Sequence, residues 1–272
     1  MRLGSLFRCS KIKYRHIFQT MTFDNQHIIR FSSIDSTNNQ AWRMIQDGIE
    51  LDGYVIQSAY QASGKGQMGA SWQSEAERNL LLSYVFRPSM VEPSNQFMIT
   101  KAVSLAVRQA MESIIPGHLF WIKWPNDLYT SGKKAGGILI ECSIQGNNID
   151  CCVAGIGLNI NQTSFSSDAP NPTSCKLLSG KDHNLDHCQK LLTNEMNSWM
   201  SLLKHRQFKH IDEAYLKYLL GYNQPMSFLE MKHNKRFWAR ITGVNKFGQL
   251  LLETEGQVRT FDMKEISLIL DS

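Results

Sequence analysis

The stretch Lys123-Trp124-Pro125-Asn126-Asp127 is the most informative part of this 272-residue chain. It puts a cation, an aromatic ring, a proline-fixed φ, an amide and a carboxylate into five consecutive residues. Extended segments, Phe120–Trp124 and Asp127–Tyr129, lie on either side of the proline, so a plain turn between two strands is one interpretation. Ten residues further on, Lys133 and Lys134 precede an apolar strand. Lysines in this position face either solvent or a pocket, and the sequence alone leaves both open.

The segments around this stretch carry strand and helix patterns. Gly137–Ile144 and Ile149–Ile160 are joined by a short polar link and predict a hairpin. Further strands are expected at Tyr54–Tyr60 and Leu80–Phe86. Helices are expected from Asp35-Ser36-Thr37-Asn38 to about Gly48, and at Gln96–Ile115, Leu185–Lys204 and Phe208–Leu220. The sequence therefore predicts an α+β fold in which helices flank a mixed sheet.

The pattern changes after Gly221. Short strands are expected at regular spacing, separated by turn residues, at Met226–Met231, Phe237–Gly243, Leu250–Glu253 and Val258–Phe261. This spacing is typical of a small β-barrel. We therefore expect a domain boundary near residue 223, with 23–223 as the larger domain and 224–272 as a small β domain.

The net charge of +5 is concentrated at the N-terminus. Residues 1–23 hold five basic residues and no acidic one, which equals the whole excess of 29 Lys+Arg over 24 Asp+Glu. Residues 1–22 are therefore interpreted as a basic leader, resembling an organellar transit peptide, or as a disordered tail; a true start at Met21 is a further alternative. The neutral remainder gives no charge pattern for nucleic-acid binding, and no apolar run is long enough to span a membrane.

Two glycine motifs indicate ligand binding. Gly64-Lys65-Gly66-Gln67-Met68-Gly69 matches the spacing of a dinucleotide motif, but a strand follows it where such a fold requires a helix. We therefore interpret residues 61–79 as a long loop whose N–H groups wrap an anion or a small ligand. Gly155 and Gly157 lie two apart in a strand, so they share a face and permit close approach of a ligand or another strand.

The six cysteines contain no C-x-x-C pair. This usage predicts a reduced, intracellular protein without a disulfide framework.

Together these motifs resemble biotin–protein ligases, of the monofunctional type that lacks an N-terminal DNA-binding domain. The family pattern has Ser-Thr-Asn, a Gln-x-x-Gly-Arg-Gly-type loop ending in Trp, Lys-Trp-Pro-Asn-Asp, a lysine ahead of Gly-Ile-Leu, and Gly-x-Gly-x-Asn. In the same order this chain has Ser36-Thr37-Asn38, Gln61 with Gly64–Gly69 and Trp72, Lys123–Asp127, Lys134 with Gly137-Ile138-Leu139, and Gly155 with Gly157 and Asn159. One departure concerns the glycine loop, where Lys65 is charged but Gln67, Met68 and Ala70 replace the family's arginine-rich pattern. The resemblance covers about residues 23–272.

The resemblance implies a fold and a reaction. The fold is that of class II aminoacyl-tRNA synthetases and biotin ligases, with a C-terminal SH3-like β-barrel. The reaction activates biotin with Mg²⁺ and ATP as biotinyl-5′-AMP, then transfers biotin to a lysine of a biotin carboxyl carrier protein domain. Positioning and charge neutralisation supply the catalysis, without a protein nucleophile.

The resemblance also assigns roles to residues. Lys134 would span the biotin carboxylate and the α-phosphate, and Lys123 would be a second catalytic cation. The residues implied for biotin are Ser36, Thr37, Asn38, Gln61, Gly64, Lys65, Gly66, Gln67, Lys134, Gly137, Gly155 and Gly157. Those implied for ATP are Lys65, Trp72, Lys123, Asn126, Asp127 and Asn159, with Asp127 also a metal ligand for Mg²⁺. Trp72 is expected to cover the adenine once the loop closes.

Two alternatives remain. A lipoate–protein ligase shares the fold and the adenylate chemistry, although Lys123–Asp127 and the C-terminal β domain favour biotin. A non-catalytic biotin- or nucleotide-binding regulator is the second, and the presence of both Lys123 and Lys134 argues against it. Only 35 residues precede Ser36, too few for a winged helix, so no operator DNA is expected as a partner. A cytoplasmic location without membrane contact is expected, and a homodimer is left open.

Overall fold

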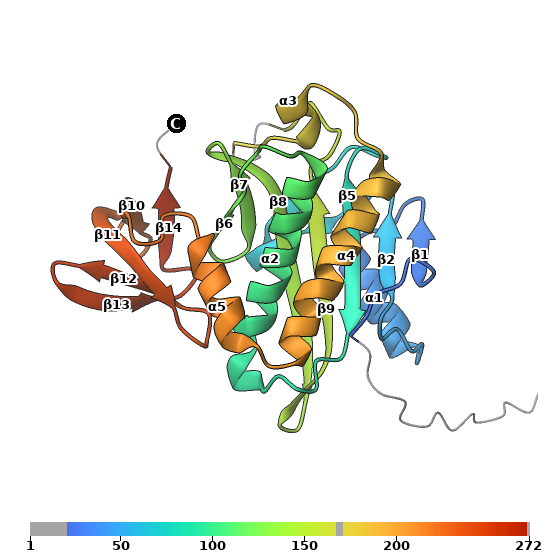
Figure 1. Cartoon of the computed structure of the whole chain (residues 1–272), viewed down its shortest axis with the longest axis horizontal. Helices are drawn as coiled ribbons and strands as arrows, with labels where there is room; N and C mark the ends of the chain where they lie inside the picture. The colour runs from blue at the N-terminus through green and yellow to red at the C-terminus, as the bar shows by residue number, and fades with distance from the viewer. Residues whose placement is uncertain (1–20, 167–170, 271–272) are drawn as a thin grey trace, which may run out of the picture.

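The computed structural model describes residues 21–166 and 171–270, and its larger part is a seven-stranded mixed sheet with helices on both faces (Figure 1). The strand order is β1-β2-β5-β9-β8-β7-β6; β1 pairs with β2 in parallel, and the other neighbours are antiparallel. The predicted α+β fold with a mixed sheet is confirmed. The strands are β1 (Ile28–Phe31), β2 (Val55–Ser58), β5 (Leu80–Phe86), β6 (Trp121–Lys123), β7 (Asp127–Thr130), β8 (Lys133–Gln145) and β9 (Asn148–Leu158).

The two faces of the sheet bury separate cores. Helices α2 (Phe97–Ile114) and α4 (Leu185–Lys204) lie side by side over one face (Figure 1), above residues such as Leu82 and Tyr84. Helix α1 (Thr37–Gln46) covers the other face, where Ala41 packs with Val85 and other buried residues. All seven residues of β5 are buried because successive side chains enter opposite cores.

An ion pair between Asp35 and Arg43 lies at the start of helix α1. Ser36 is the N-cap residue, and Asp35 accepts two hydrogen bonds from the guanidinium of Arg43, at 2.9 and 2.6 Å. The hydrogen bonds from Arg43 hold the pKa of Asp35 well below its usual range. This pair anchors the helix end that carries Ser36, Thr37 and Asn38.

The C-terminal part is a five-stranded antiparallel sheet in the order β13-β12-β11-β10-β14. Its strands are β10 (Pro225–Glu230), β11 (Lys235–Val244), β12 (Leu250–Thr254), β13 (Gln257–Phe261) and β14 (Ile266–Ile269). The inner face buries Phe228, Ile241 and Leu252. No pairing joins β13 to β14 in the described part of the chain, so this SH3-like unit is an open sheet and not a closed barrel. It packs beside the β6–β7 end of the large sheet, and α5 (Phe208–Lys217) precedes it in the chain (Figure 1).

Secondary structure also appears where a loop was expected. Residues 61–79 contain a hairpin of β3 (Gly64–Lys65) and β4 (Ser71–Trp72), with a 3₁₀ turn, Gln67–Gly69, at its tip. A short helix, α3 (Cys175–Ser179), lies between β9 and α4, where no helix was predicted.

The expectation of a chain without disulfides is wrong, because Cys142 and Cys152 form one. The antiparallel register of β8 and β9 places these residues directly opposite each other, with Cα atoms 4.1 Å apart. The sequence signal was missed because the spacing that matters is the strand register, not a C-x-x-C motif. Cys151, Cys175 and Cys188 are free and buried.

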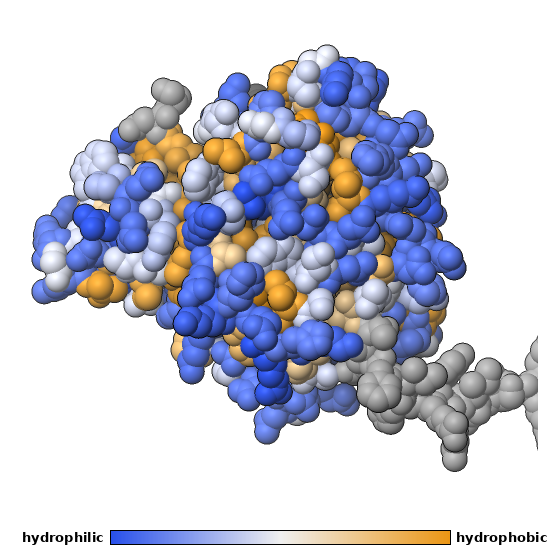
Figure 2. All heavy atoms as spheres, in the orientation of Figure 1, coloured by the Kyte–Doolittle hydropathy of each residue, from blue (hydrophilic) through white to orange (hydrophobic). Residues whose placement is uncertain are grey.

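The predicted leader, 1–22, lies outside the described residues except for its last two. Met21 and Phe23 are both buried, and the ring of Phe23 packs edge-on against Tyr84 at 4.8 Å. Packing of the described chain into the core therefore begins at Met21. Among residues 21–166 and 171–270, no helix is both long and apolar enough to cross a membrane. Hydrophilic residues predominate on the face that carries α4 and α5, with hydrophobic ones in small separate patches (Figure 2).

Candidate active site

A pocket of about 290 Å³ lies between the large sheet, the β3–β4 hairpin and the C-terminal sheet. All of the predicted site residues line it except Gly64 and Asn159. Gly64 belongs to β3 of the hairpin and pairs with Trp72, whose carbonyl oxygen would lie 2.4 Å from a Cβ at this position. The Asn159 side chain donates to the carbonyl of Thr173 at 2.9 Å, which ties β9 to a neighbouring loop. The structure thus brings together segments from residue 36 to residue 268.

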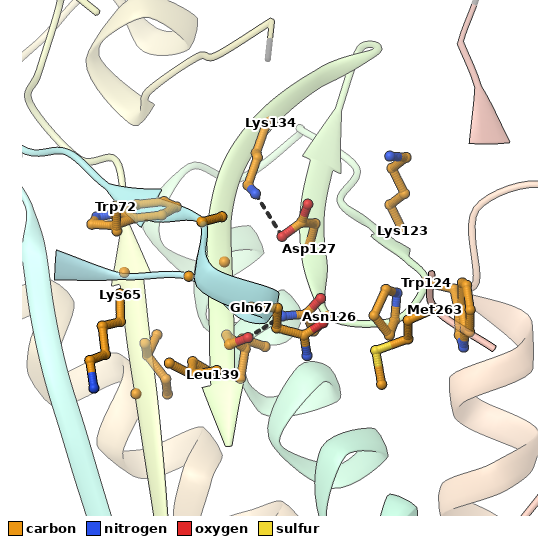
Figure 3. Close-up of a pocket in the computed structure, with 18 of the residues that line it drawn as sticks. Lys65, Gln67, Trp72, Lys123, Trp124, Asn126, Asp127, Lys134, Leu139 and Met263 are labelled. Carbon is orange, nitrogen blue, oxygen red and sulfur yellow. Dashed lines mark hydrogen bonds and ion pairs between the residues drawn. The ribbon is translucent and has the colours of Figure 1, made fainter. Parts of the chain in front are cut away.

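Three charged side chains line one corner of the pocket: Lys134 points to Asp127, and Lys123 stands apart from both (Figure 3). Lys123, Asp127 and Lys134 come from β6, β7 and β8, and the ladders between these strands keep them adjacent. The Lys134 Nζ lies 2.7 Å from the Asp127 Oδ1. Burial lowers the pKa of Lys123; Asp127 opposes this shift, and Lys134 adds to it. A corner with two cations and one carboxylate suits a ligand that brings further negative charge.

An aromatic ring borders this corner on each side. The Lys134 Nζ lies 5.8 Å from the centre of a Trp72 ring, and the Lys123 Nζ lies 5.3 Å from the centre of the Tyr129 ring. Burial raises the pKa of Tyr129 to about 12, so its hydroxyl stays protonated at neutral pH. Cation–π contact with these rings attracts the two ammonium groups and leaves their charge in place.

Trp72 lies flat against glycines of the sheet. A Cβ on Gly157 would come within 2.6 Å of the Trp72 ring, and one on Gly137 within 3.1 Å. The Trp72 Nε1 is buried and has no hydrogen-bond partner among the described residues. Gly155 makes room for a different residue, since its Cβ would lie 2.4 Å from the Asn38 Oδ1. The space that these glycines create therefore holds Trp72 and Asn38 in this structure.

The N-terminal end of α1 forms the opposite wall. The Thr37 amide and hydroxyl both donate to the Gln61 Oε1, at 2.7 and 3.1 Å. Asn38 donates to the Glu141 carboxylate at 2.8 Å and accepts from the Ser83 hydroxyl at 2.6 Å. Ser83 and Glu141 orient a site residue and were missed by sequence analysis, because both sit singly within apolar strands.

The Lys123–Asp127 turn is tied to the elements around it. Its Trp124–Pro125 bond is cis. The Asn126 side chain donates to the Ile138 carbonyl, and the Ile138 amide donates to the Asn126 carbonyl at 3.1 Å. The Trp124 indole donates to the Gly248 carbonyl of the C-terminal sheet at 2.9 Å. The turn therefore bridges β8 and the C-terminal sheet.

Within the glycine motif Gly64–Gly69, Lys65 is the single cation, and it is exposed. In Figure 3 the Lys65 side chain points away from Lys134 and Asp127, whereas Gln67 lies beside Asn126. Met68 sits at the loop tip with a φ of 59° and is 53% exposed. The loop thus presents a neutral side chain, Gln67, to the turn.

The C-terminal unit contributes residues that sequence analysis did not assign to the site. Met263, Ser267 and Leu268 line the pocket beside the Lys123–Asp127 turn. Their side chains carry no charge or metal-binding signal that a sequence pattern could reveal. Only the docking of the two sheets makes them part of the site.

Comparisons with known proteins agree with this geometry. Residues 31–159 match the biotin/lipoate A/B protein ligase family. The bifunctional ligase/repressor BirA of Bacillus spizizenii is 29% identical over 89% of this chain and 74% of its own length. The biotin–[acetyl-CoA-carboxylase] ligase of Mycobacterium tuberculosis is 31% identical over 51% of each chain.

The fold has a solved counterpart as well. The biotin protein ligase from Aquifex aeolicus, determined in complex with biotin and ATP, superposes with a TM-score of 0.75. The match covers 90% of this chain and all of that one, at 24% sequence identity. This likeness establishes a shared architecture over both sheets.

Proposed function

We propose that this chain, whose residues 31–159 match the biotin/lipoate A/B protein ligase family, is a biotin protein ligase. It activates biotin with ATP as biotinyl-5′-AMP and transfers the biotinyl group to a lysine of a carrier protein domain, forming an amide bond. The observation that carries this proposal is the convergence of Lys123, Asp127 and Lys134 beside Trp72 in the pocket.

The first step joins two anions. A carboxylate oxygen of biotin attacks the α-phosphorus of ATP, and the bond to the β-phosphate breaks to release pyrophosphate. Lys134 neutralises the biotin carboxylate and the α-phosphate of ATP, and Lys123 neutralises the remaining phosphates of ATP. In the structure Asp127 pairs with Lys134, so an arriving anion that takes Lys134 leaves the Asp127 carboxylate free to bind another cation.

Walls on either side orient the substrates. Ser36 and Gln61 offer a hydroxyl and a side-chain amide for the polar atoms of biotin, with Thr37 bonded to Gln61 and Asn38 held by Ser83 and Glu141 behind them. Trp72 offers a ring face for adenine. Its unpartnered Nε1 offers a donor.

The donor set fits a magnesium ion that arrives with the nucleotide. Asp127 is the sole carboxylate among the described residues that line the pocket, and no group of three or more potential metal ligands gathers in the described chain. Mg²⁺ is commonly held by one or two carboxylates together with substrate phosphates, which matches this arrangement. When bound, the ion would neutralise phosphate charge; Asp127 is the residue that would hold it.

The second step transfers the activated acyl group. The uncharged amine of an acceptor lysine attacks the acyl carbon of the mixed anhydride, AMP leaves, and the nitrogen loses a proton. Water must be kept away from the mixed anhydride until the acceptor binds. The β3–β4 hairpin, with Trp72, lies over the pocket in a position to exclude water. We propose a carboxyl carrier domain as acceptor and the cytoplasm as the location.

Biotin-dependent exchange of pyrophosphate into ATP tests this proposal. We expect exchange with biotin and at least a hundredfold less with lipoate at equal concentration, on the order of what one mismatched buried group changes. Exchange with lipoate alone would assign the chain to the other branch of the family. Binding of biotin and ATP without exchange would identify a non-catalytic regulator.

A further inference from the structure

A buried cation that the mechanism does not use lies on α2. Lys101 is 1% exposed, and its neighbours on the helix, Ala102 and Leu105, belong to the main core. Lysine is among the residues least often buried, and burial requires a compensating partner. Lys101 therefore needs a structural or functional reason.

The Lys101 ammonium contacts three separate elements. It forms an ion pair with Asp212 of α5 and donates to the carbonyl of Val244, in β11 of the C-terminal sheet, at 3.4 Å. It also lies 5.6 Å from the centre of the Phe97 ring and 5.5 Å from that of Tyr215. One charge thus holds α2, α5 and the C-terminal sheet together.

The same contacts continue to the catalytic turn. The Tyr215 hydroxyl donates to the Pro125 carbonyl at 3.5 Å. Phe97 packs on Gly248, where a Cβ would lie 2.5 Å from its ring, and the Gly248 carbonyl accepts from Trp124. The two aromatic rings around Lys101 therefore touch the Lys123–Asp127 turn on one side and the C-terminal sheet on the other.

We propose that Lys101 is a positioning residue that sets the C-terminal sheet against the Lys123–Asp127 turn and thereby shapes the nucleotide end of the pocket. Met263, Ser267 and Leu268 line that end. The opposite end is formed by Thr37 of α1 and Gln61, which bond to each other. This inference rests on the proposed function for its assignment of the nucleotide end.

The variant Lys101→Met tests it, because methionine fills a similar volume and packs well against aromatic rings. We expect the KM for ATP to rise by about tenfold or more, as small displacements in a catalytic site do. The KM for biotin should change less than twofold. A merely destabilised enzyme would lose active molecules and kcat while keeping both KM values, and that result would overturn the inference.

Arg108→Met is the matched control. Arg108 is 6% exposed on the same helix, pairs with Glu112 and stacks on Tyr218 at 3.3 Å. None of its contacts within the described chain reaches the C-terminal sheet. We expect it to lower stability without changing the KM for ATP; a shift equal to that of Lys101→Met would contradict a specific role for Lys101.

Asp212→Asn provides a second route if Lys101→Met folds poorly. Its side chain is 38% exposed, so the change is tolerated at the surface while the ion pair is lost. It should raise the KM for ATP in the same direction. In the double variant the two effects should be less than additive, because both remove one interaction; full additivity would count against the proposal.

Hydrogen exchange separates this inference from the proposed function. In Lys101→Met we expect faster amide exchange in residues 245–249, at the edge facing α2, and unchanged exchange in the outer strand β13. If the wild type shows no biotin-dependent activity, the proposed function fails and this readout alone decides the inference. Unchanged exchange in residues 245–249 would overturn it.

Discussion

Lys123, Asp127 and Lys134 show how single residues create a site for anions. Two ammonium groups and one carboxylate share a pocket corner, and Asp127 pairs with Lys134 at 2.7 Å. Lys123 has no carboxylate at that distance among its described contacts, and burial lowers its pKa. The corner therefore holds one balanced and one unbalanced cation, an arrangement that stabilises a bound polyphosphate more than the empty protein.

The first prediction concerns Lys134→Ala. Loss of a cation that acts on the reacting carboxylate and α-phosphate should lower biotin-dependent pyrophosphate exchange by about 10²–10³-fold. Biotin binding should weaken far less, because the α1 wall is untouched. Lys133→Ala is the matched control: Lys133 is the preceding residue of β8 and is exposed. Exchange close to that of the control would rule out the assigned role of Lys134.

The second prediction concerns pH and Lys123→Met. Burial lowers the pKa of Lys123 in the folded protein below 10.5. The charged ammonium is therefore less stable in the folded protein than in the unfolded chain. This penalty is complete at pH values below the lowered pKa and fades as pH rises from there to 10.5. Lys123→Met should therefore be more stable than the wild type at pH 7, with a difference that shrinks toward pH 10.5, and it should lose exchange activity. Denaturant unfolding between pH 7 and pH 10.5 measures the difference in unfolding free energy. A Lys123→Met variant that is less stable than the wild type at pH 7 would contradict the account.

At the scale of elements, sequence patterns located long units better than short ones. The bounds of β5 and α4 were predicted from runs of apolar residues and from helix periodicity, and both agree with the structure. The β3–β4 hairpin and β14 were not expected as strands. These three strands, of two and four residues, lack a clear apolar pattern and form through pairing with a neighbour; the equally short β6 and β7 were expected because they flank the Lys123–Asp127 motif.

The disulfide between Cys142 and Cys152 gives the third prediction. Alkylation of the unfolded, unreduced protein should leave these two thiols protected while Cys151, Cys175 and Cys188 react. The bridge spans 10 residues of sequence. Its reduction should therefore lower the free energy of unfolding by about 2–3 kcal/mol in the chain-entropy description. Cys151→Ser should leave the protection of Cys142 and Cys152 and the effect of reduction unchanged, whereas alkylation of Cys142 in the unreduced protein would show that the bridge is absent.

At the scale of the whole molecule, two sheets share one pocket. Motif spacing located the residues on the large sheet, from Ser36 to Gly157, because each motif carries its own chemistry. It also predicted a small β unit after residue 223. It did not predict which residues of that unit reach the pocket, because the docking depends on single contacts such as Trp124 with Gly248.

The fourth prediction tests that docking. Gly248 has a φ of 86°, and a Cβ there would lie 2.5 Å from the Phe97 ring. Gly256 has a φ of 74° and open space around it. Ala at either position should lower stability by about 1 kcal/mol through backbone strain. Only Gly248→Ala should also raise the KM for ATP, because it pushes the β11–β12 loop away from Phe97 of α2. Equal kinetics in the two variants would contradict a functional role for the interface.

Transfer to a carrier is the most direct test of the central claim. The purified protein is incubated with ATP, Mg²⁺, biotin and a biotin carboxyl carrier domain, and the domain is weighed by intact mass spectrometry. We predict the addition of one biotinyl group to the acceptor lysine, dependent on both ATP and biotin and absent with a carrier in which that lysine is replaced by arginine. An unmodified carrier, or modification only when lipoate replaces biotin, would contradict the account.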